Sequence, residues 1–296
     1  MADYILSCCS SIDISRELIE KCGIKFVPFH FFVDGTEYVD DLGDSMPYDV
    51  FYNKIKNGAD TRTSQVNISE FVDYFGGFLR QGYDIVHVCL SSGLSGTVNS
   101  AKNAAEILKE QYPERNIYIV DSLAASAGFG LLMVSAAEKR DEGLSAAELA
   151  QWIEGNRLRV HHWFFSTDLS TYVKGGRISR TAAVFGGALQ ICPLLNVDNL
   201  GRLIPREKVR TKKKVIAEIV KKMEENADGG LDYSGRCFIS AAGCPDDARQ
   251  VAALVEERFP NLKDGRAEIS DIGTIIGSHT GPGTVALFFF GKKREN

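Results

Sequence analysis

The chain has 296 residues, 44% of them hydrophobic and 25% charged, so it can bury a substantial core and divides most naturally into two domains. Its formal net charge of -5 excludes the basic footprint that general affinity for nucleic acid requires. The seven cysteines are scattered and show no C-x-x-C spacing, which predicts reduced, mostly buried thiols and neither a metal site nor a disulfide frame. No leader and no long apolar run is visible, which predicts a cytoplasmic protein without a membrane span.

The first half of the chain alternates strand-like and helix-like segments. Short apolar runs predict strands at Tyr4–Ser7, Lys25–Val33, Tyr83–Leu90 and Ile117–Val120. Apolar residues recurring every three or four positions predict helices at Arg16–Cys22, Tyr48–Lys56, Ile68–Gln81, Val98–Tyr112, Gly130–Arg140 and Ala146–Glu154. This alternation is typical of α/β proteins, so we expect residues 1–160 to form an N-terminal three-layer α/β/α domain with a parallel sheet.

From about His161 the pattern changes. Extended segments are expected at Trp163–Ser166, Cys237–Ala241, Ala267–Ile272 and Thr284–Phe290, and a hairpin is expected around Asn199-Leu200-Gly201. Helical periodicity covers Val215–Met223 and Ala248–Phe259. We therefore expect residues 161–296 to form a second α/β domain with a mixed or antiparallel sheet, its final strands packing at the interface between the domains, where ligands commonly bind.

The segment Leu90–Thr97 joins a predicted strand to a predicted helix and is rich in hydroxyls and glycines. The start of a helix offers unpaired backbone N–H groups and the positive end of its dipole, which favour an oxyanion. Ser92, Ser95 and Thr97 add hydroxyl donors, and few cations lie nearby, which suits a carboxylate better than a polyphosphate. The alternative is an ordinary strand–helix joint in which Ser95 only caps the helix.

Two further segments contain polar groups that can contact a ligand. Thr63 and Ser64 precede a helix whose start is marked by Asn67 and Glu70, the spacing of a capping box, so their hydroxyls remain available. Residues 277–284 combine turn residues with His279, whose charge is adjustable near neutral pH. The alternatives are a polar surface loop and a hairpin turn with an exposed histidine; His30, His87, His161 and His162 fall in strand-like runs and are expected to be structural.

Two segments of the second half concentrate positive charge. They are Lys174–Arg180, which contains Arg177, and Arg206–Lys214. Such runs form either a solvated face or a docking surface for an acidic partner, a phosphate or an anionic membrane.

Taken in order, six motifs resemble the DegV family of bacterial fatty-acid-binding proteins, some of which serve as the acyl-carrying subunit of fatty acid kinase. The motifs span nearly the whole chain: Thr63-Ser64-Gln65, Leu90–Thr97, Val120-Asp121-Ser122, Gly175-Gly176-Arg177-Ile178, Lys208-Val209-Arg210-Thr211 and His279–Gly283. The resemblance implies two α/β domains with the fatty acid between them and its carboxylate held by Thr63 and Ser95. It also implies that His279 lies nearby and that Arg210 belongs to a surface that engages the kinase.

This chain departs from the family at its first strand. Ser7-Cys8-Cys9 stands where members usually have Thr-Asp-Ser, so no role is transferred to that segment.

The leading hypothesis is a non-enzymatic carrier without a cofactor, which binds a long-chain fatty acid in a buried tunnel and presents its carboxylate to a separate kinase. The predicted ligand-binding residues are Thr63, Ser64, Ser92, Ser95, Gly96, His279 and Thr280, and the predicted partner-binding residues are Arg177 and Arg210. Tunnel lining is expected from Phe26–Phe32, Phe71–Phe78 and Ala182–Leu194.

Two other functions fit the sequence. Ser95, Asp121 and His279 follow the chain order of an α/β-hydrolase triad, which would make the protein an acyl hydrolase, although Thr97 replaces the second glycine of G-x-S-x-G. A regulatory protein that senses acyl ligands is the third hypothesis; nothing resembles a DNA-reading helix-turn-helix.

Overall fold

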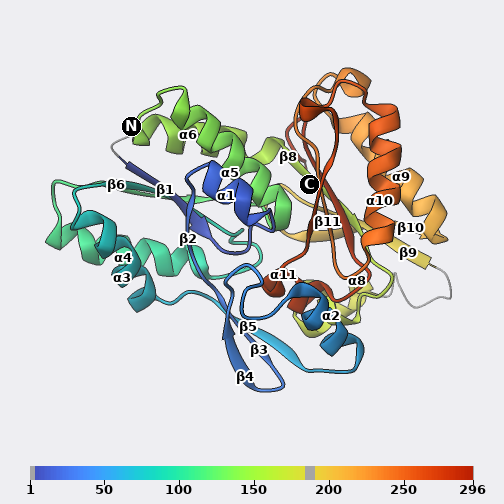
Figure 1. Cartoon of the computed structure of the whole chain (residues 1–296), viewed down its shortest axis with the longest axis horizontal. Coiled ribbons are helices and arrows are strands. Elements are labelled where there is room, and N and C mark those ends of the chain that lie inside the picture. The colour runs from blue at the N-terminus through green and yellow to red at the C-terminus, as the bar shows by residue number, and fades with distance from the viewer. Residues whose placement is uncertain (1–3, 184–190, 296) are drawn as a thin grey trace.

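The first sheet is parallel, with the strand order β2-β1-β6-β7. We analysed a computed structural model of the chain, which describes residues 4–183 and 191–295. The strands are β1 (Tyr4–Cys9), β2 (Lys25–Val27), β6 (Asp84–Cys89) and β7 (Ile117–Asp121). The helices of this region are α1 (Arg16–Lys21), α3 (Ile68–Leu79), α4 (Thr97–Gln111), α5 (Ser126–Asp141) and α6 (Ala146–Asn156). Figure 1 shows α3 and α4 on one side of the sheet and α5 and α6 on the other, as predicted.

A second, smaller sheet is antiparallel and was not predicted. Its strands, in the order β4-β3-β5, are β4 (Thr36–Val39), β3 (His30–Val33) and β5 (Thr61–Ser64), and α2 (Tyr48–Lys56) lies between β4 and β5 in the chain. The expected single strand Lys25–Val33 is wrong, because Pro28 and Phe29 separate β2 from β3 and the two strands join different sheets. The sequence therefore turns out of the first sheet here and carries Thr63 on β5.

The third sheet is mixed, with the strand order β10-β9-β8-β13-β11-β12. Its strands are β8 (Val160–Phe165), β9 (Ile191–Val197), β10 (Leu203–Arg210), β11 (Phe238–Ala241), β12 (Glu268–Asp271) and β13 (Val285–Phe290). β11 and β12 pair in parallel and the other neighbours are antiparallel, which confirms both the mixed sheet and the hairpin around Asn199-Leu200-Gly201.

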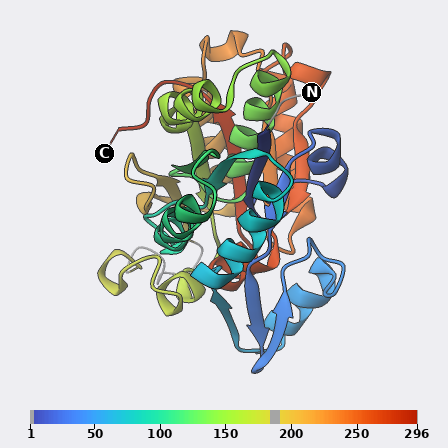
Figure 2. The same cartoon turned by 90° about the vertical axis from the view of Figure 1, so that its left-hand side faces the viewer.

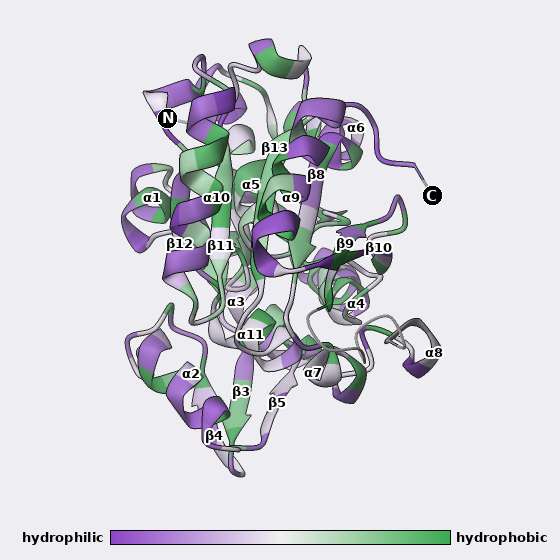
Figure 3. Ribbon diagram, turned by 90° about the vertical axis from the view of Figure 1, so that its right-hand side faces the viewer, coloured by the Kyte–Doolittle hydropathy of each residue, from purple (hydrophilic) through white to green (hydrophobic). Residues whose placement is uncertain are grey.

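Helices cover both faces of the third sheet. α9 (Lys212–Asn226) and α10 (Pro245–Arg258) pack on one face, and Figure 3 shows the strongly hydrophobic strands β11 and β13 behind them. α5 packs on β8, β11 and β13 from the other side and is buried along most of its length. A Cβ atom on Gly128 of α5 would lie 2.4 Å from Nε2 of His162, so only glycine permits this close contact between helix and sheet.

Three short helices lie around the small sheet and the ends of the larger strands. They are α7 (Ser170–Lys174), α8 (Arg180–Ala183) and α11 (Thr274–Thr280). Single 3₁₀ turns of the described residues occur at Arg157–Arg159, Gly230–Asp232 and Lys263–Gly265. α11 contacts α2, α7, β3 and β5, while both described ends of the chain lie away from the small sheet (Figure 2). Among the described residues, no helix has both the length and the apolar character needed to cross a bilayer.

The predicted glycine-rich loop at residues 277–284 is wrong in its first half. Residues up to Thr280 form α11, which ends where Gly281 adopts a φ of 69°. His279 therefore lies in the last turn of a helix, and Gly281-Pro282-Gly283 forms the turn into β13. The helix gives His279 a fixed direction that a hairpin turn would not.

Candidate functional site

A cavity of about 490 Å³ lies among segments that are far apart in the chain. Its volume falls within the range of roughly 300–1,000 Å³ that is usual for small-molecule sites. Apolar side chains form most of its wall: Phe29, Leu90, Leu94, Ala125, Phe164, Val197, Leu203, Ile272, Ile275, Ile276, Ala286 and Phe288. The polar lining residues are Thr63, Ser64, Gln65, Ser95, Gly96, Ser126, His162, Arg177, His279, Thr280 and Thr284. Six of the seven predicted ligand-binding residues thus lie on one cavity, together with Arg177.

Ser95 lies two residues before the first residue of α4, in the loop that follows β6. Its hydroxyl oxygen accepts a hydrogen bond from the N–H of Thr97 at 3.3 Å, so its own proton stays available for an acceptor in the cavity. The N–H of neighbouring Gly96 donates to no acceptor among the described residues. A hydroxyl and a backbone N–H at the positive end of a long helix are suited to an anionic oxygen. The N-cap of α4 is Gly96 and not Ser95, and the bond from the Thr97 N–H leaves Ser95 able to contact a ligand.

Thr63 and His279 meet across the cavity wall from β5 and α11. Thr63 Oγ1 lies 2.8 Å from His279 Nε2, and His279 Nδ1 has no hydrogen-bond partner. Burial, together with the positive charge of Arg177, lowers the pKa of His279 to about 4, so the imidazole is neutral at pH 7. With its proton on Nε2, His279 donates to Thr63 and leaves the threonine hydroxyl free to donate into the cavity. Thr280 adds a buried hydroxyl oxygen that also lacks a partner.

Arg177 brings a positive charge to the same wall. Its guanidinium donates to the carbonyls of Gly175 and Leu94, at 2.5 and 3.0 Å. These bonds connect the α7 region to the loop of residues 90–96 between β6 and α4, which we call the serine loop. Burial lowers the pKa of Arg177 from its usual value of 12.5, and the group stays cationic at neutral pH. A carboxylate at this end of the cavity would meet two hydroxyls, one N–H and one nearby cation.

Gly175 explains the need for glycine in the Gly175-Gly176-Arg177 motif. A Cβ atom at this position would lie 2.5 Å from Nδ1 of His279, closer than real Cβ contacts allow. The missing side chain therefore admits the imidazole to its position beside Thr63.

We expect Gly175→Ala to lower the free energy of unfolding by about 1–3 kcal/mol, because the added methyl group must displace His279 or the chain around α7. Urea unfolding of the variant and the parent protein measures this difference. Gly155→Ala is the matched control, since nothing lies within 4 Å of a Cβ at that position on α6. Equal stability of Gly175→Ala and the parent would show that this contact is not tight.

The cavity has a buried apolar part and a more accessible polar end. Phe29, Ile272 and Phe288 are nearly inaccessible to solvent, whereas Thr63 and Ser95 are half-buried and Gly96 is exposed. An elongated amphiphile would therefore place its apolar part inside and its polar group toward the surface.

Ser92 and Arg210 lie outside this cavity, unlike the other predicted site residues. Ser92 is exposed on the loop, and its N–H donates to the Asp121 carboxylate at 3.1 Å, so the expected contact with a ligand has no geometric support. Arg210 is exposed at the end of β10. Within the same basic run, Lys212 donates to Asp247 at 2.8 Å, so part of the positive charge is already neutralised.

The geometry does not support the predicted hydrolase triad. The Asp121 carboxylate accepts from the backbone N–H groups of Ser92 and Leu123, at 3.1 and 3.0 Å, and so fixes the loop. His279 instead pairs with Thr63 and has no carboxylate on Nδ1 to orient it as a base. Ser95, Asp121 and His279 therefore follow the order of a hydrolase triad in the chain but do not form a triad in the structure.

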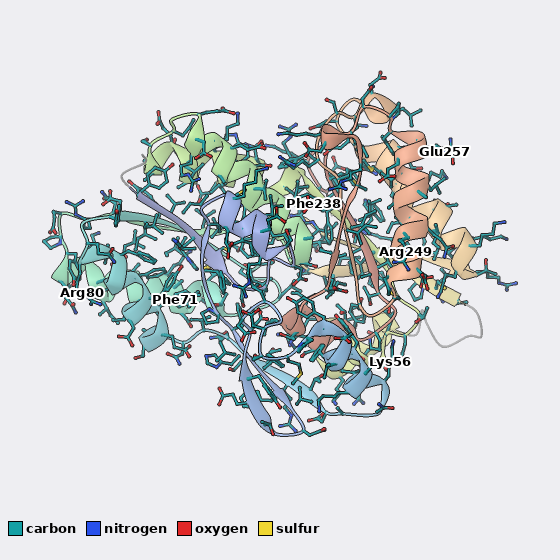
Figure 4. All side chains as sticks on the ribbon, in the orientation of Figure 1. Lys56, Phe71, Arg80, Phe238, Arg249 and Glu257 are labelled. Atoms are coloured by element: carbon teal, nitrogen blue, oxygen red, sulfur yellow. The ribbon has the colours of Figure 1, made fainter. Side chains whose placement is uncertain are left out.

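The predicted lining is only partly correct. Phe29 from the first predicted run lines the cavity, but Phe71 and Phe75 pack instead against His87 in the core beneath α3, where Figure 4 labels Phe71. Residues 184–190 of the third predicted run lie outside the described part of the chain. Apolar side chains from β13 and α11 form much of the cavity wall instead. Apolar periodicity does not distinguish a side chain that lines a cavity from one that packs in the core.

Ser126 and His162 line the cavity and were not predicted as site residues. Ser126 Oγ donates to the buried carboxylate of Asp13 at 2.6 Å. His162 accepts from the N–H of Ala125 at 3.3 Å and bonds the carbonyl of Val160 at 3.0 Å, so both of its nitrogens are engaged. These hydrogen bonds fit the structural role predicted for His162, whose ring also forms part of the cavity wall. Nothing in the sequence connects Ser126 with Asp13.

The family model of DegV proteins matches residues 9–292. The chain belongs to the DegV family. A DegV domain-containing protein of Clostridium perfringens is 36% identical over 295 residues, which cover all of both chains. Among solved structures, the DegV fatty-acid-binding protein of Bacillus subtilis matches with a TM-score of 0.83 and 27% identity, over 99% of this chain and all of that one. The Fak B3 protein of the Streptococcus pneumoniae fatty acid kinase, loaded with linoleic acid, matches with a TM-score of 0.83 and 21% identity, over the same shares, and at that identity shows the DegV fold alone.

Proposed function

We propose that this DegV protein binds one long-chain fatty acid in the cavity, with the carboxylate at Ser95, Gly96, Thr63 and His279. The observation that carries the proposal is the joining of a buried apolar cavity to a half-buried set of neutral donors. The B. subtilis relative is a fatty-acid-binding protein, and a DegV family protein of Thermus thermophilus, 27% identical to this chain, also binds fatty acid.

The two parts of the site divide the binding energy. A buried CH₂ group contributes about 0.8 kcal/mol, so some 14 methylenes are worth roughly 11 kcal/mol before ordering costs. Neutral hydroxyls and one N–H then fix the orientation of the head group. In this proposal both domains, residues 1–160 and 161–296, surround the ligand. Thr63 and Ser95 come from the first domain, and His279 comes from the second.

Native mass spectrometry of the purified protein tests this proposal. We expect an adduct with the mass of a fatty acid of long chain length, which organic extraction releases in one equivalent. A protein that is empty on purification and also fails to bind added fatty acid would contradict it.

We further propose that the protein is a carrier without catalytic activity of its own and that a separate kinase phosphorylates the bound carboxylate. The half-buried head-group site supports this, because a partner enzyme can reach the carboxylate without removing the chain. The name of the S. pneumoniae neighbour suggests the same kind of partner. Basic residues at the start of α9 support a transient contact with an anionic membrane, from which the fatty acid would enter.

Arg210→Ala is expected to reduce acyl phosphate formation by the kinase about tenfold and to leave fatty acid affinity unchanged, because Arg210 is exposed and does not line the cavity. Assays of both properties with purified kinase measure the two effects separately. Arg80→Ala, at an exposed arginine after α3, is the control. If Arg210→Ala lost both properties in parallel, Arg210 would contribute to the fold or to the ligand site. If the parent protein bound fatty acid but supported no kinase reaction, a ligand-sensing role would be favoured.

A further inference from the structure

A second cluster of reactive side chains lies in the core of the first sheet, apart from the fatty acid cavity. β1 and β6 are parallel neighbours, with Ser7 opposite His87. Because side chains alternate between the faces of a sheet, Ser7 and Cys9 share one face with His87 and Cys89. This register places Cys9 and Cys89 beside each other where the two strands end.

The distances within this cluster suit a metal ion. Cys9 Sγ lies 3.8 Å from His87 Nε2, and the ligand atoms of Cys9, His87 and Cys89 all lie within 4.8 Å of one another. Metal bonds of about 2.3 Å to sulfur and about 2.0–2.1 Å to nitrogen would separate a sulfur and a nitrogen ligand by about 3.6–3.8 Å. An ion therefore fits between these atoms with little movement of the side chains.

The surroundings hold the imidazole in the orientation that ligation needs. Ser7 Oγ lies 2.7 Å from His87 Nδ1, which leaves Nε2 directed at Cys9. The rings of Phe71, Tyr74 and Phe75 pack around His87, and all three candidate ligands are fully buried. A hydrogen bond to the far nitrogen and an apolar shell are usual features of metal-binding histidines.

We propose that Cys9, His87 and Cys89 bind one thiophilic metal ion, Cu⁺ or Zn²⁺. Two sulfurs and one imidazole are soft to borderline donors that select these ions over Mg²⁺ or Ca²⁺. Three ligands suit Cu⁺, whereas the charge of two thiolates is neutralised by Zn²⁺, which usually takes a fourth ligand. Cys9 and His87 come from two strands and are almost eighty residues apart in the chain. The prediction of no metal site depended on the spacing of cysteines along the chain, and such spacing cannot reveal a cluster that two distant strands form.

Metal titration of the reduced full-length protein tests the proposal. The protein is first refolded with a chelator, and the chelator is then removed. Zn²⁺ or ascorbate-reduced Cu⁺ is added in the absence of oxygen. Each ion is added to the folded protein and, in a separate sample, during a second refolding. We expect one equivalent of one of these ions, X-ray absorption that shows two sulfur donors and one nitrogen donor, and a Tm that rises by about 4 °C at a hundred-fold excess over Kd. Saturation by Zn²⁺ or by Cu⁺ identifies which ion the cluster prefers.

Variants locate the ion. Cys9→Ser and Cys89→Ser should each weaken binding at least a hundred-fold, while Cys8→Ala should bind as the parent does, because Cys8 is equally buried but points to the other face of β1. If a serine variant does not fold, the X-ray absorption of the parent protein still identifies the donors. Substoichiometric binding of both ions, oxygen and nitrogen donors alone, or unchanged binding in both serine variants would overturn the proposal. The proposal does not depend on fatty acid binding.

Discussion

A protein with both Thr63→Val and Ser95→Ala is expected to bind a saturated long-chain fatty acid between about 30-fold and about 25,000-fold more weakly than the parent. Each substitution removes a hydroxyl that faces the half-buried carboxylate of the proposed complex, and each such hydrogen bond is worth about 1–3 kcal/mol. Valine keeps the shape of threonine, so the cavity and its apolar contacts remain. Competition with a fluorescent fatty acid measures the affinity of each protein.

Ser92→Ala is the matched control for this pair. Ser92 lies on the same loop as Ser95, but it is exposed and outside the cavity. The fatty acid affinity of Ser92→Ala should equal that of the parent. The single variants Thr63→Val and Ser95→Ala should each lose less affinity than the double variant. Unchanged affinity in the double variant would mean that the carboxylate does not lie at Thr63 and Ser95.

Asp13→Asn is expected to stabilise the protein at pH 8 by about 4 kcal/mol relative to the parent, with no gain at pH 4. Burial raises the pKa of Asp13 to about 7, although the hydrogen bond from Ser126 opposes this change. Between pH 4 and 7 the folded chain keeps a proton on Asp13 that the unfolded chain has released. The free energy of unfolding of the parent therefore falls as the pH rises through this range, and asparagine removes the dependence.

Urea unfolding of both proteins at several pH values measures this difference. Titration of other groups, such as the buried histidines, is common to both proteins and cancels in the comparison. Asp73→Asn, at an exposed position on α3, should change stability equally little at every pH. A gain for Asp13→Asn that does not grow between pH 4 and 7 would show that Asp13 is ionised in the folded protein throughout.

Local patterns predicted the elements that depend on periodicity. The capping box of Asn67 and Glu70 forms as expected, and the serine loop opens α4 after a buried parallel strand. These features follow from neighbours in the chain, so the residue order contains enough information to predict them.

Long-range packing decided the features that the sequence did not reveal. The small sheet forms because β3 and β5 pair across 28 to 34 positions, from Val33 with Thr61 to His30 with Ser64, and this pairing positions Thr63. α11 is a short helix in a segment rich in glycine, and its contacts with β3, β5 and α7 stabilise it where propensity alone favours a turn.

The meeting of Thr63 with His279 likewise depends on tertiary structure. The two residues are 216 positions apart, and a Gly175 without a side chain is needed for the approach. The motifs showed that these segments matter, but no spacing between them could show which atoms face each other. The same reason hid the Cys9, His87 and Cys89 cluster.

A crystal structure of the protein with its bound fatty acid tests the central claim most directly. We predict continuous elongated density that begins within hydrogen-bond distance of Ser95 Oγ and Thr63 Oγ1 and runs between Phe29, Phe164, Ile275 and Phe288. Density whose polar end lies elsewhere, or an acyl chain that lies outside this cavity, would contradict it.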